Sequence, residues 1–399
     1  METIPTTDSD PPLRSVHTTS LPHILSRLGA SLAVSTYQAG RLVLLRPEQR
    51  SDGPVLNTHF RGFKKPMGFA WEPGRFALGT QAEVWEFHDM PAVARKLESA
   101  ESPGKHDAAF LPRNVHYTGD VQIHEMAWAP RLTPPGSPGD RRDLSELWFV
   151  NTRFSCLATR SDIYSFTPRW KPPFISGLTP QDRCHLNGMC LRDGQVRYVT
   201  ALGETDDPAG WRANKRAGGV LVDVQGNEIL TRGLSMPHSP RWHQGKLWVL
   251  ESGNGGVGTV DEKTGKYDEI CRLPGFTRGL DFAGPYAFVG LSQVRESAVF
   301  SGIAIAEMKP EERNCGVWAI DLRNGNVAGF VKFVNAVQEI FAVQVLPGMV
   351  WPEVLNEDPQ RISESFELPD EAMRLVPEDW RQSSNAGSNT PLKGDSAIP

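Results

Sequence analysis

The fold is decided by a pattern that is clearest in residues 237–260, PHSPRWHQGKLWVLESGNGGVGTV. A short run of residues leads into a turn at 243–246, HQGK, and a second, strongly apolar run follows at 247–250, LWVL. β-Branched and aromatic residues favour strands, and the glycine of the turn supplies a positive φ. A third run, GVGTV, follows a glycine-rich turn. The stretch therefore predicts antiparallel strands joined by tight turns.

Five other segments repeat this pattern weakly but in register. The six repeats begin near Met67, His124, His185, His238, Arg278 and Glu339. Their mean spacing is roughly 54 residues, slightly above the 40–50 typical of propeller blades, which suits four short strands with insertions. We therefore expect an all-β fold, a six-bladed β-propeller. A two-sheet β-sandwich is the alternative, but it would not account for six repeats.

The two ends of the repeat region complement each other. The last repeat stops after residues 349–354, MVWPEV, whereas residues 31–46, SLAVSTYQAGRLVLLR, form a hairpin that belongs to no repeat. We expect the N-terminal strands to complete the last blade, because closure of the ring removes an exposed sheet edge. The propeller then spans residues 29–356. Residues 1–28 are expected to be a flexible N-terminal arm with a short helical stretch, and residues 357–399 a largely disordered tail.

Composition narrows the class of protein. The 399 residues carry a formal net charge of −5, so we expect neither nucleic acid nor an acidic membrane surface as a partner. Residues 1–20 are polar, without the apolar stretch of a signal peptide, and no run approaches the roughly eighteen apolar residues of a membrane helix. The five cysteines include no CxxC pair. These features favour a cytoplasmic protein with reduced thiols.

Three consecutive repeats begin with histidine. In a propeller the innermost strand of each blade begins at one mouth of the central channel, so His124, His185 and His238 are expected to converge. Neutral imidazoles bind divalent transition metals such as zinc, iron, manganese or copper, and three of them leave open positions for water or substrate. These histidines are the predicted metal ligands. The register of the second is ambiguous, because Asn187 aligns with the repeat start as well as His185 does.

Two further repeat starts supply the predicted catalytic residues. Arg278 is a candidate clamp for the carboxylate or phosphate of a substrate. Glu339 is a candidate general base, and Glu339 or Glu125 could be a fourth metal ligand or could accept a hydrogen bond from a ligand histidine.

These residues lead to two hypotheses about function. The first is a metal-dependent enzyme that acts on a small molecule or peptide at the channel, by hydrolysis, elimination or oxidation. The second is a non-catalytic propeller that serves as a platform for protein interaction or ligand binding, with structural histidines. A calcium-dependent lactonase would require clustered carboxylates at the axis, and the sequence offers few.

Three longer phrases extend beyond the repeat pattern. They are CHLNGMCL at residues 184–191, GLSMPHSPRWHQGKLWVLESGNG at 233–255 and PGFTRGLDF at 274–282. They closely resemble a bacterial family of conserved propeller-like proteins that is classed as a domain of unknown function. The resemblance extends over residues 31–354. It implies the propeller fold and assigns no activity.

Overall fold

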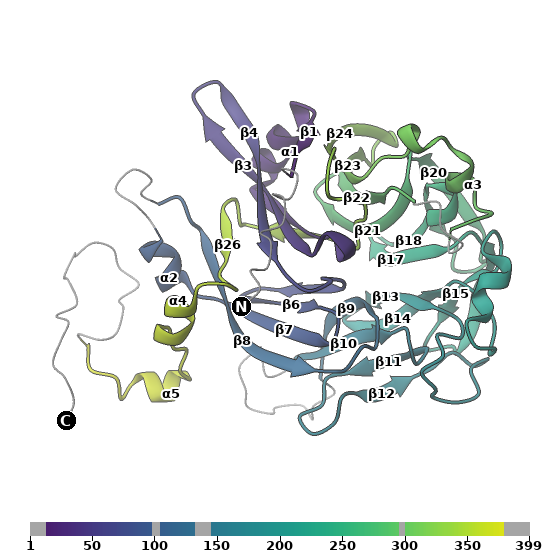
Figure 1. Ribbon diagram of the computed structural model, residues 1–399, viewed down its shortest axis with the longest axis horizontal. Coiled ribbons are helices and arrows are strands. Elements are labelled where there is room, and N and C mark those ends of the chain that lie inside the picture. The colour runs from purple at the N-terminus through teal and green to yellow at the C-terminus, as the bar shows by residue number, and fades with distance from the viewer. Residues whose placement is uncertain (1–12, 98–103, 132–144, 295–299, 379–399) are drawn as a thin grey trace, which may run out of the picture.

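The computed structural model describes residues 13–97, 104–131, 145–294 and 300–378. Its six sheets are arranged around a central axis, and we number these blades in the order of their innermost strands (Figure 1). The blades have four or five strands each. The prediction of a six-bladed β-propeller is confirmed.

Each blade is a meander of short strands that runs outward from the axis. In that order, blade 1 contains β5 (Phe69–Glu72), β6 (Arg75–Gly79), β7 (Glu83–Asp89), β8 (Ala108–Tyr117) and β26 (Pro352–Val354). Blade 2 contains β9 (Ile123–Pro130), β10 (Ser145–Asn151), β11 (Cys156–Thr159) and β12 (Thr167–Trp170). Blade 3 contains β13 (Leu186–Arg192), β14 (Gln195–Ala201), β15 (Gly219–Asp223) and β16 (Glu228–Leu234). Blade 4 contains β17 (Pro237–His243), β18 (Lys246–Glu251), β19 (Gly256–Val260) and β20 (Tyr267–Arg272). Blade 5 contains β21 (Phe276–Ala283), β22 (Tyr286–Ser292), β23 (Gly316–Asp321), β24 (Asn326–Phe333) and β1 (Ser15–His17). Blade 6 contains β25 (Ala342–Pro347), β2 (Ala30–Ser35), β3 (Arg41–Arg50) and β4 (Gly53–Gly62).

Short helices lie in the connections and near the termini. The α-helices are α1 (Ser20–Leu28), α2 (Pro91–Lys96), α3 (Ala304–Glu307), α4 (Pro359–Glu364) and α5 (Asp370–Met373). The 3-10 helices are η1 (Tyr37–Ala39), η2 (Gly210–Asn214), η3 (Ser252–Asn254) and η4 (Pro310–Glu312). Within the described part of the chain, none of the helices combines the length and the apolar character needed to span a bilayer.

Blade 6 closes the ring as expected. Its innermost strand, β25, comes from the end of the propeller, and it pairs antiparallel with β2 from the beginning, so that Ser35 lies opposite Ala342 and Ala30 opposite Pro347. β3 and β4 then continue the blade outward. Three N-terminal strands therefore form the outer part of a blade whose inner strand comes from the end of the propeller.

The core consists of apolar layers between neighbouring blades. In β2, Leu32 and Val34 pack towards blade 5, while Ala33 packs towards blade 1. Successive side chains of a strand point to opposite faces, so a strand between two other blades is apolar on both faces. This explains why all six residues of β2 are buried. Six such layers, one per blade boundary, hold the ring together.

The N-terminal segment differs from the flexible arm expected for residues 1–28. β1 pairs with the outer strand β24, with Ser15 opposite Phe333. α1 buries Leu21, Ile24 and Leu25 in the layer between blades 5 and 6. These positions follow the i, i+3, i+4 spacing of a helix face, which makes the segment part of the core. Residues 1–12 lie outside the described residues.

The C-terminal segment contains two short helices after β26. α4 and α5 are short and contain no buried residue. Glu367, between them, lies within hydrogen-bonding distance of His88 on β7. The rest of the expected tail, residues 379–399, lies outside the described residues.

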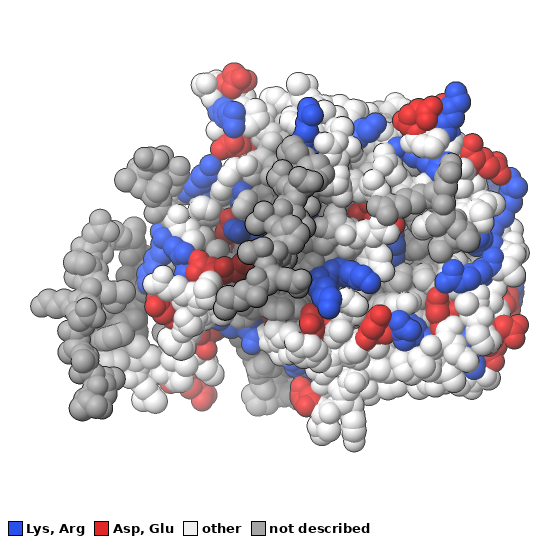
Figure 2. Space-filling model, in the orientation of Figure 1, with Lys and Arg blue, Asp and Glu red and all other residues white. Residues whose placement is uncertain are grey.

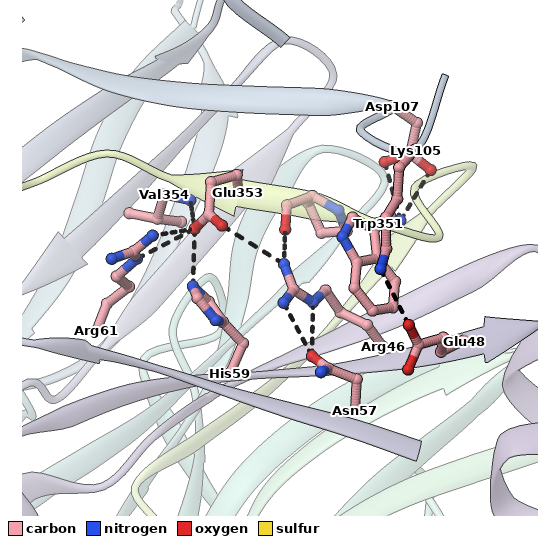
Figure 3. Close-up of polar contacts among 11 residues, drawn as sticks. Arg46, Glu48, Asn57, His59, Arg61, Lys105, Asp107, Trp351, Glu353 and Val354 are labelled. Carbon is pink, nitrogen blue, oxygen red and sulfur yellow. Dashed lines mark hydrogen bonds and ion pairs between the residues drawn. The ribbon is translucent and has the colours of Figure 1, made fainter. Parts of the chain in front are cut away.

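A polar clasp joins blade 6 to blade 1 where the chain leaves the ring (Figure 3). We use this name for Arg46, His59, Arg61, Trp351 and Glu353. β26 carries Glu353 and pairs parallel with β8 of blade 1, whereas Arg46, His59 and Arg61 lie on β3 and β4 of blade 6. The Glu353 carboxylate lies 2.9 Å from His59 Nε2, accepts a hydrogen bond of 2.7 Å from Arg61 and lies 3.6 Å from Arg46. One buried carboxylate therefore links two blades.

The indole of Trp351 completes the clasp. The Arg46 guanidinium carbon lies 4.2 Å from the centre of the Trp351 ring, and Lys105 Nζ lies 4.1 Å from it. Asp107 accepts a hydrogen bond of 3.0 Å from the Trp351 backbone N–H. Cations favour the electron-rich face of an indole, so these contacts fix the segment that leads into β26.

Candidate functional site

The predicted histidines converge at the axial end at which β9, β13 and β17 begin. The rings of His124 and His185 meet edge to face, with centroids 4.9 Å apart. His238 is in ring contact with Phe276 instead, at 5.4 Å, but it lies near enough to His185 for a charge there to lower its pKa. We call the side chains of His124, His185, His238 and Arg278 the axial site.

Each imidazole is held through Nδ1. His124 Nδ1 lies 3.0 Å from the carbonyl oxygen of Gln122, and His238 Nδ1 lies 2.9 Å from that of Met236. His185 Nδ1 lies 2.9 Å from the carboxylate of Asp182. A carbonyl or carboxylate oxygen can only accept, so each histidine carries a proton on Nδ1, and the neutral ring has a lone pair on Nε2.

The backbone around these contacts is in an uncommon conformation. φ is 55° at Gln122, 47° at Asp182, 50° at His185 and 46° at Met236. Non-glycine residues rarely adopt the left-handed region, and such residues gather at functional sites. Each residue that supplies a carbonyl or carboxylate acceptor for a histidine is thus in this region. Lys65 and Ala336, which precede the inner strands of blades 1 and 6, have the same conformation, so the turns that lead into the inner strands orient these acceptors.

Arg278 presents an unpaired cation to the axial site. Its guanidinium carbon lies 3.5 Å from the centre of the Phe341 ring. Within the described ranges of the chain, no hydrogen bond or ion pair reaches this guanidinium. Burial lowers the pKa of Arg278 to about 10, and the negative charge of Glu339 opposes that shift. Arg278 remains fully charged at neutral pH.

The two deeper histidines are neutral at the same pH. Burial, and then the charge of Arg278, hold the pKa of His124 well below its ordinary value. The same two causes, in the same order, lower the pKa of His238. The axial site therefore combines one fixed positive charge with two imidazoles that do not take up a proton.

The Nε2 atoms of His124 and His238 and the guanidinium nitrogen atoms of Arg278 remain accessible to water. Among the described residues, the polar side-chain atoms that are both sealed from solvent and without a partner include Asn187 Nδ2. They do not include any nitrogen of the axial site. A pocket of about 280 Å³ lies in the connections of blade 3. It is lined in part by Trp211, whose ring lies 4.6 Å from that of His185, and none of the four axial-site side chains lines it.

Glu125 is not placed as the sequence suggested. It was a candidate fourth metal ligand, but its carboxylate accepts a hydrogen bond of 2.7 Å from Arg241, a residue two blades away. Asp281 lies near the same pair and accepts hydrogen bonds from Gln344 and from the Val345 backbone. Glu125 thus neutralises a buried arginine. Glu339 lies near enough to Arg278 for its charge to raise the pKa of the guanidinium, and its role as a general base stays a prediction from the sequence.

The described residues do not fit a metal centre as they stand. Across these ranges, no group of three or more histidine, cysteine, aspartate or glutamate side chains has an arrangement that could hold an ion. The charge of Arg278 at the same point also opposes a divalent cation. The metal site with His124, His185 and His238 as ligands stays a prediction from the sequence.

Several residues of the site carry no repeat signal. Asp182 holds His185 and accepts a second hydrogen bond from Trp211 Nε1, at 3.1 Å. Thr152 and Ser252 each follow the second strand of a blade and lie 2.7 Å from His124 Nδ1 and 3.0 Å from His238 Nδ1. The sequence signal that could have identified Thr152 and Ser252 is the hydroxyl residue that follows the second strand in blades 2 and 4.

Fold and site together define a six-bladed β-propeller with a histidine- and arginine-lined axial end. The chain belongs to the family described as a domain of unknown function (DUF4915), whose family model matches residues 19–355. The resemblance expected from the sequence is thereby confirmed as to family. No curated protein matches the chain.

Several solved structures are similar in fold. A chain of a nidogen/laminin complex is 8% identical, with a TM-score of 0.46 over 80% of this chain and 99% of that one. A protein of unknown function from Bacteroides caccae is also 8% identical, with a TM-score of 0.46 over 79% and 98%. Virginiamycin B lyase from Staphylococcus aureus is 10% identical, with a TM-score of 0.37 over 81% and 99%. At these values the similarities say nothing about function.

Proposed function

We propose that the axial site binds a small anionic molecule and that Arg278 holds its negative group. The observation that carries the proposal is the unpaired guanidinium of Arg278, which is partly buried against Phe341. A guanidinium has five N–H donors, and removal of such a charge from water is costly unless it is paired. A carboxylate or phosphate supplies both the opposite charge and the matching acceptors.

The binding of an anion would come from this interior group and not from the general surface charge. On the face drawn in Figure 2, basic and acidic side chains are mixed. The formal net charge of the chain is −5. An anion that binds at the axial site is therefore selected by local pairing with Arg278, because the protein as a whole does not attract it.

The proposal keeps part of both hypotheses from the sequence. It retains a small molecule at the channel and the role of Arg278 as an anion clamp. It replaces the metal-dependent enzyme with a ligand-binding propeller, because the histidines are not arranged as metal ligands and Arg278 opposes a divalent cation. It requires no chemical step.

The experiment measures the binding of acetate, inorganic phosphate and sulfate by calorimetry and by the shift in melting temperature. We expect at least one anion to bind saturably, and Arg278→Gln to weaken it by about tenfold or more, the usual effect of losing a charge-assisted pair. Arg323→Gln is the matched control, because Arg323 lies in an exposed turn and pairs with Asp321. Equal affinity in Arg278→Gln and the wild type would overturn the proposal, as would a wild type that binds none of the three.

A further inference from the structure

The axial site contains hydrogen-bond acceptors beside its cation. The Thr152 hydroxyl donates to the Leu186 carbonyl at 2.6 Å, so it accepts from His124 Nδ1. The proton of His124 is therefore on Nδ1, and that of His238, which faces the Met236 carbonyl, is on Nδ1 as well. In both rings the free Nε2 can only accept a hydrogen bond.

The acceptors are held in place before any ligand arrives. His124 packs against the Phe341 ring at 4.9 Å, the same ring that carries Arg278 at 3.5 Å. His238 packs against Phe276 at 5.4 Å. Both aromatic rings are buried, so neither imidazole has to be ordered when a ligand binds. Cation and acceptors thus form one rigid set.

We infer that the ligand is an anion that carries hydroxyl groups beside its charged group. The negative group pairs with Arg278, and the hydroxyls donate to Nε2 of His124 and His238. An ammonium group would also donate, but Arg278 repels a second cation. An anion without donors leaves both imidazole lone pairs unsatisfied where water has been displaced, and sites of this kind discriminate strongly against such analogues. The inference rests on the proposed function and names the ligand class of the same site.

The sequence contains a natural model for the variant that removes an acceptor. Asn187 is the second residue of β13, as His124 is of β9 and His238 of β17. Asparagine therefore fits this position of a blade. The amide oxygen of Asn187 accepts a hydrogen bond of 2.7 Å from Thr200, and the shorter side chain has no atom in the place of Nε2. His124→Asn and His238→Asn therefore keep a polar side chain at this position and remove the Nε2 acceptor.

The experiment uses two pairs of probes that share a carbon skeleton and a charge. Glycerate is compared with propionate, and glycerol 3-phosphate with propyl phosphate, by calorimetry at pH 7.5. We expect the hydroxylated member of one pair to bind at least tenfold more tightly, and the pair that shows this identifies a carboxylate or a phosphate as the charged group. In His238→Asn, and separately in His124→Asn, the preference should fall several-fold while the affinity for the other member is unchanged.

The outcomes separate this inference from the proposed function. If Arg278→Gln no longer binds either probe of a pair, the proposed function is supported, whether or not the wild type prefers the hydroxylated probe. Equal binding of the two members in both pairs overturns the inference alone, and so does a preference that survives in both asparagine variants. If no probe binds to the wild type, the inference and the proposed function both fail. Circular dichroism and melting temperature show whether each variant is folded.

Discussion

Replacement of Glu353 by glutamine should destabilise the protein in a pH-dependent way. Burial alone would raise the pKa of this carboxyl, but the hydrogen bonds and charges of His59 and Arg61 outweigh it and hold the pKa at about 2. Glutamine keeps the size of the side chain and removes the charge. Arg46, which is almost fully buried in the clasp, then loses its opposite charge.

The expected magnitude follows from the shift. The pKa falls from an ordinary 4.5 to about 2, and each unit corresponds to about 1.4 kcal/mol, so the charged form contributes about 3 kcal/mol to the free energy of unfolding. Because the pKa in the folded protein is lowered, this contribution is complete well above pH 4.5. It is lost as the pH falls towards 2, and about half of it remains at pH 3.

Urea denaturation of the wild type and of Glu353→Gln measures this difference. We expect the variant to be about 3 kcal/mol less stable at pH 7, and the gap to narrow to about half at pH 3. Glu48→Gln is the matched control, because Glu48 pairs with Lys105 at the more exposed edge of the same region and should cost less than about 1 kcal/mol. A difference of less than 0.5 kcal/mol at pH 7, or one that does not change with pH, would refute the reasoning.

Three further predictions concern the rest of the chain. Leu25→Ala should lower the free energy of unfolding by about 2–4 kcal/mol, because it opens a cavity under α1. Arg27→Ala, at an exposed position of the same helix, should have little effect. Equal melting temperatures of the two variants would show that α1 is not part of the core. Glu125→Gln should cost about 1–3 kcal/mol in urea denaturation, because it removes the carboxylate that pairs with Arg241 and leaves only the nearby charge of Asp281; an unchanged midpoint would contradict this. Mass spectrometry should find no divalent metal in stoichiometric amount in the purified protein. A metal that is present in the wild type and absent from His238→Asn would instead support the hypothesis of a metal-dependent enzyme.

The blades could be predicted because the repeat is a physical unit. Residues 237–260 form β17, β18 and β19 in the expected order, with the turn at residues 243–246. The contribution of the N-terminal strands to the last blade could be predicted as well, because pairing the N-terminal hairpin with the incomplete last repeat removes the exposed edges of both. The arm could not be predicted from composition. The helical spacing of Leu21, Ile24 and Leu25 was the relevant signal, and a segment this short gives it weakly.

The axial site could be predicted only in part. His124 and His238 occupy equivalent positions in their blades, so comparison of the repeats identifies both as residues of the axial site. His185 precedes its strand and is placed by Asp182, while Asn187 takes the equivalent position in blade 3. The pairing of Glu125 with Arg241 was beyond the reach of the sequence, because the two residues lie two blades apart and meet only in three dimensions.

The way in which blade 6 is assembled has a consequence for biosynthesis. β2, β3 and β4 emerge from the ribosome before any other strand of the ring except β1, and their inner neighbour, Ala342–Pro347, emerges among the last elements of the propeller. Until then the nascent chain carries an apolar strand with an open edge, a target for chaperones and for misassociation. A truncated chain that stops before this strand would contain four complete blades, since blade 1 would lack β26 and blade 6 its inner strand, and the cell's quality control should remove it.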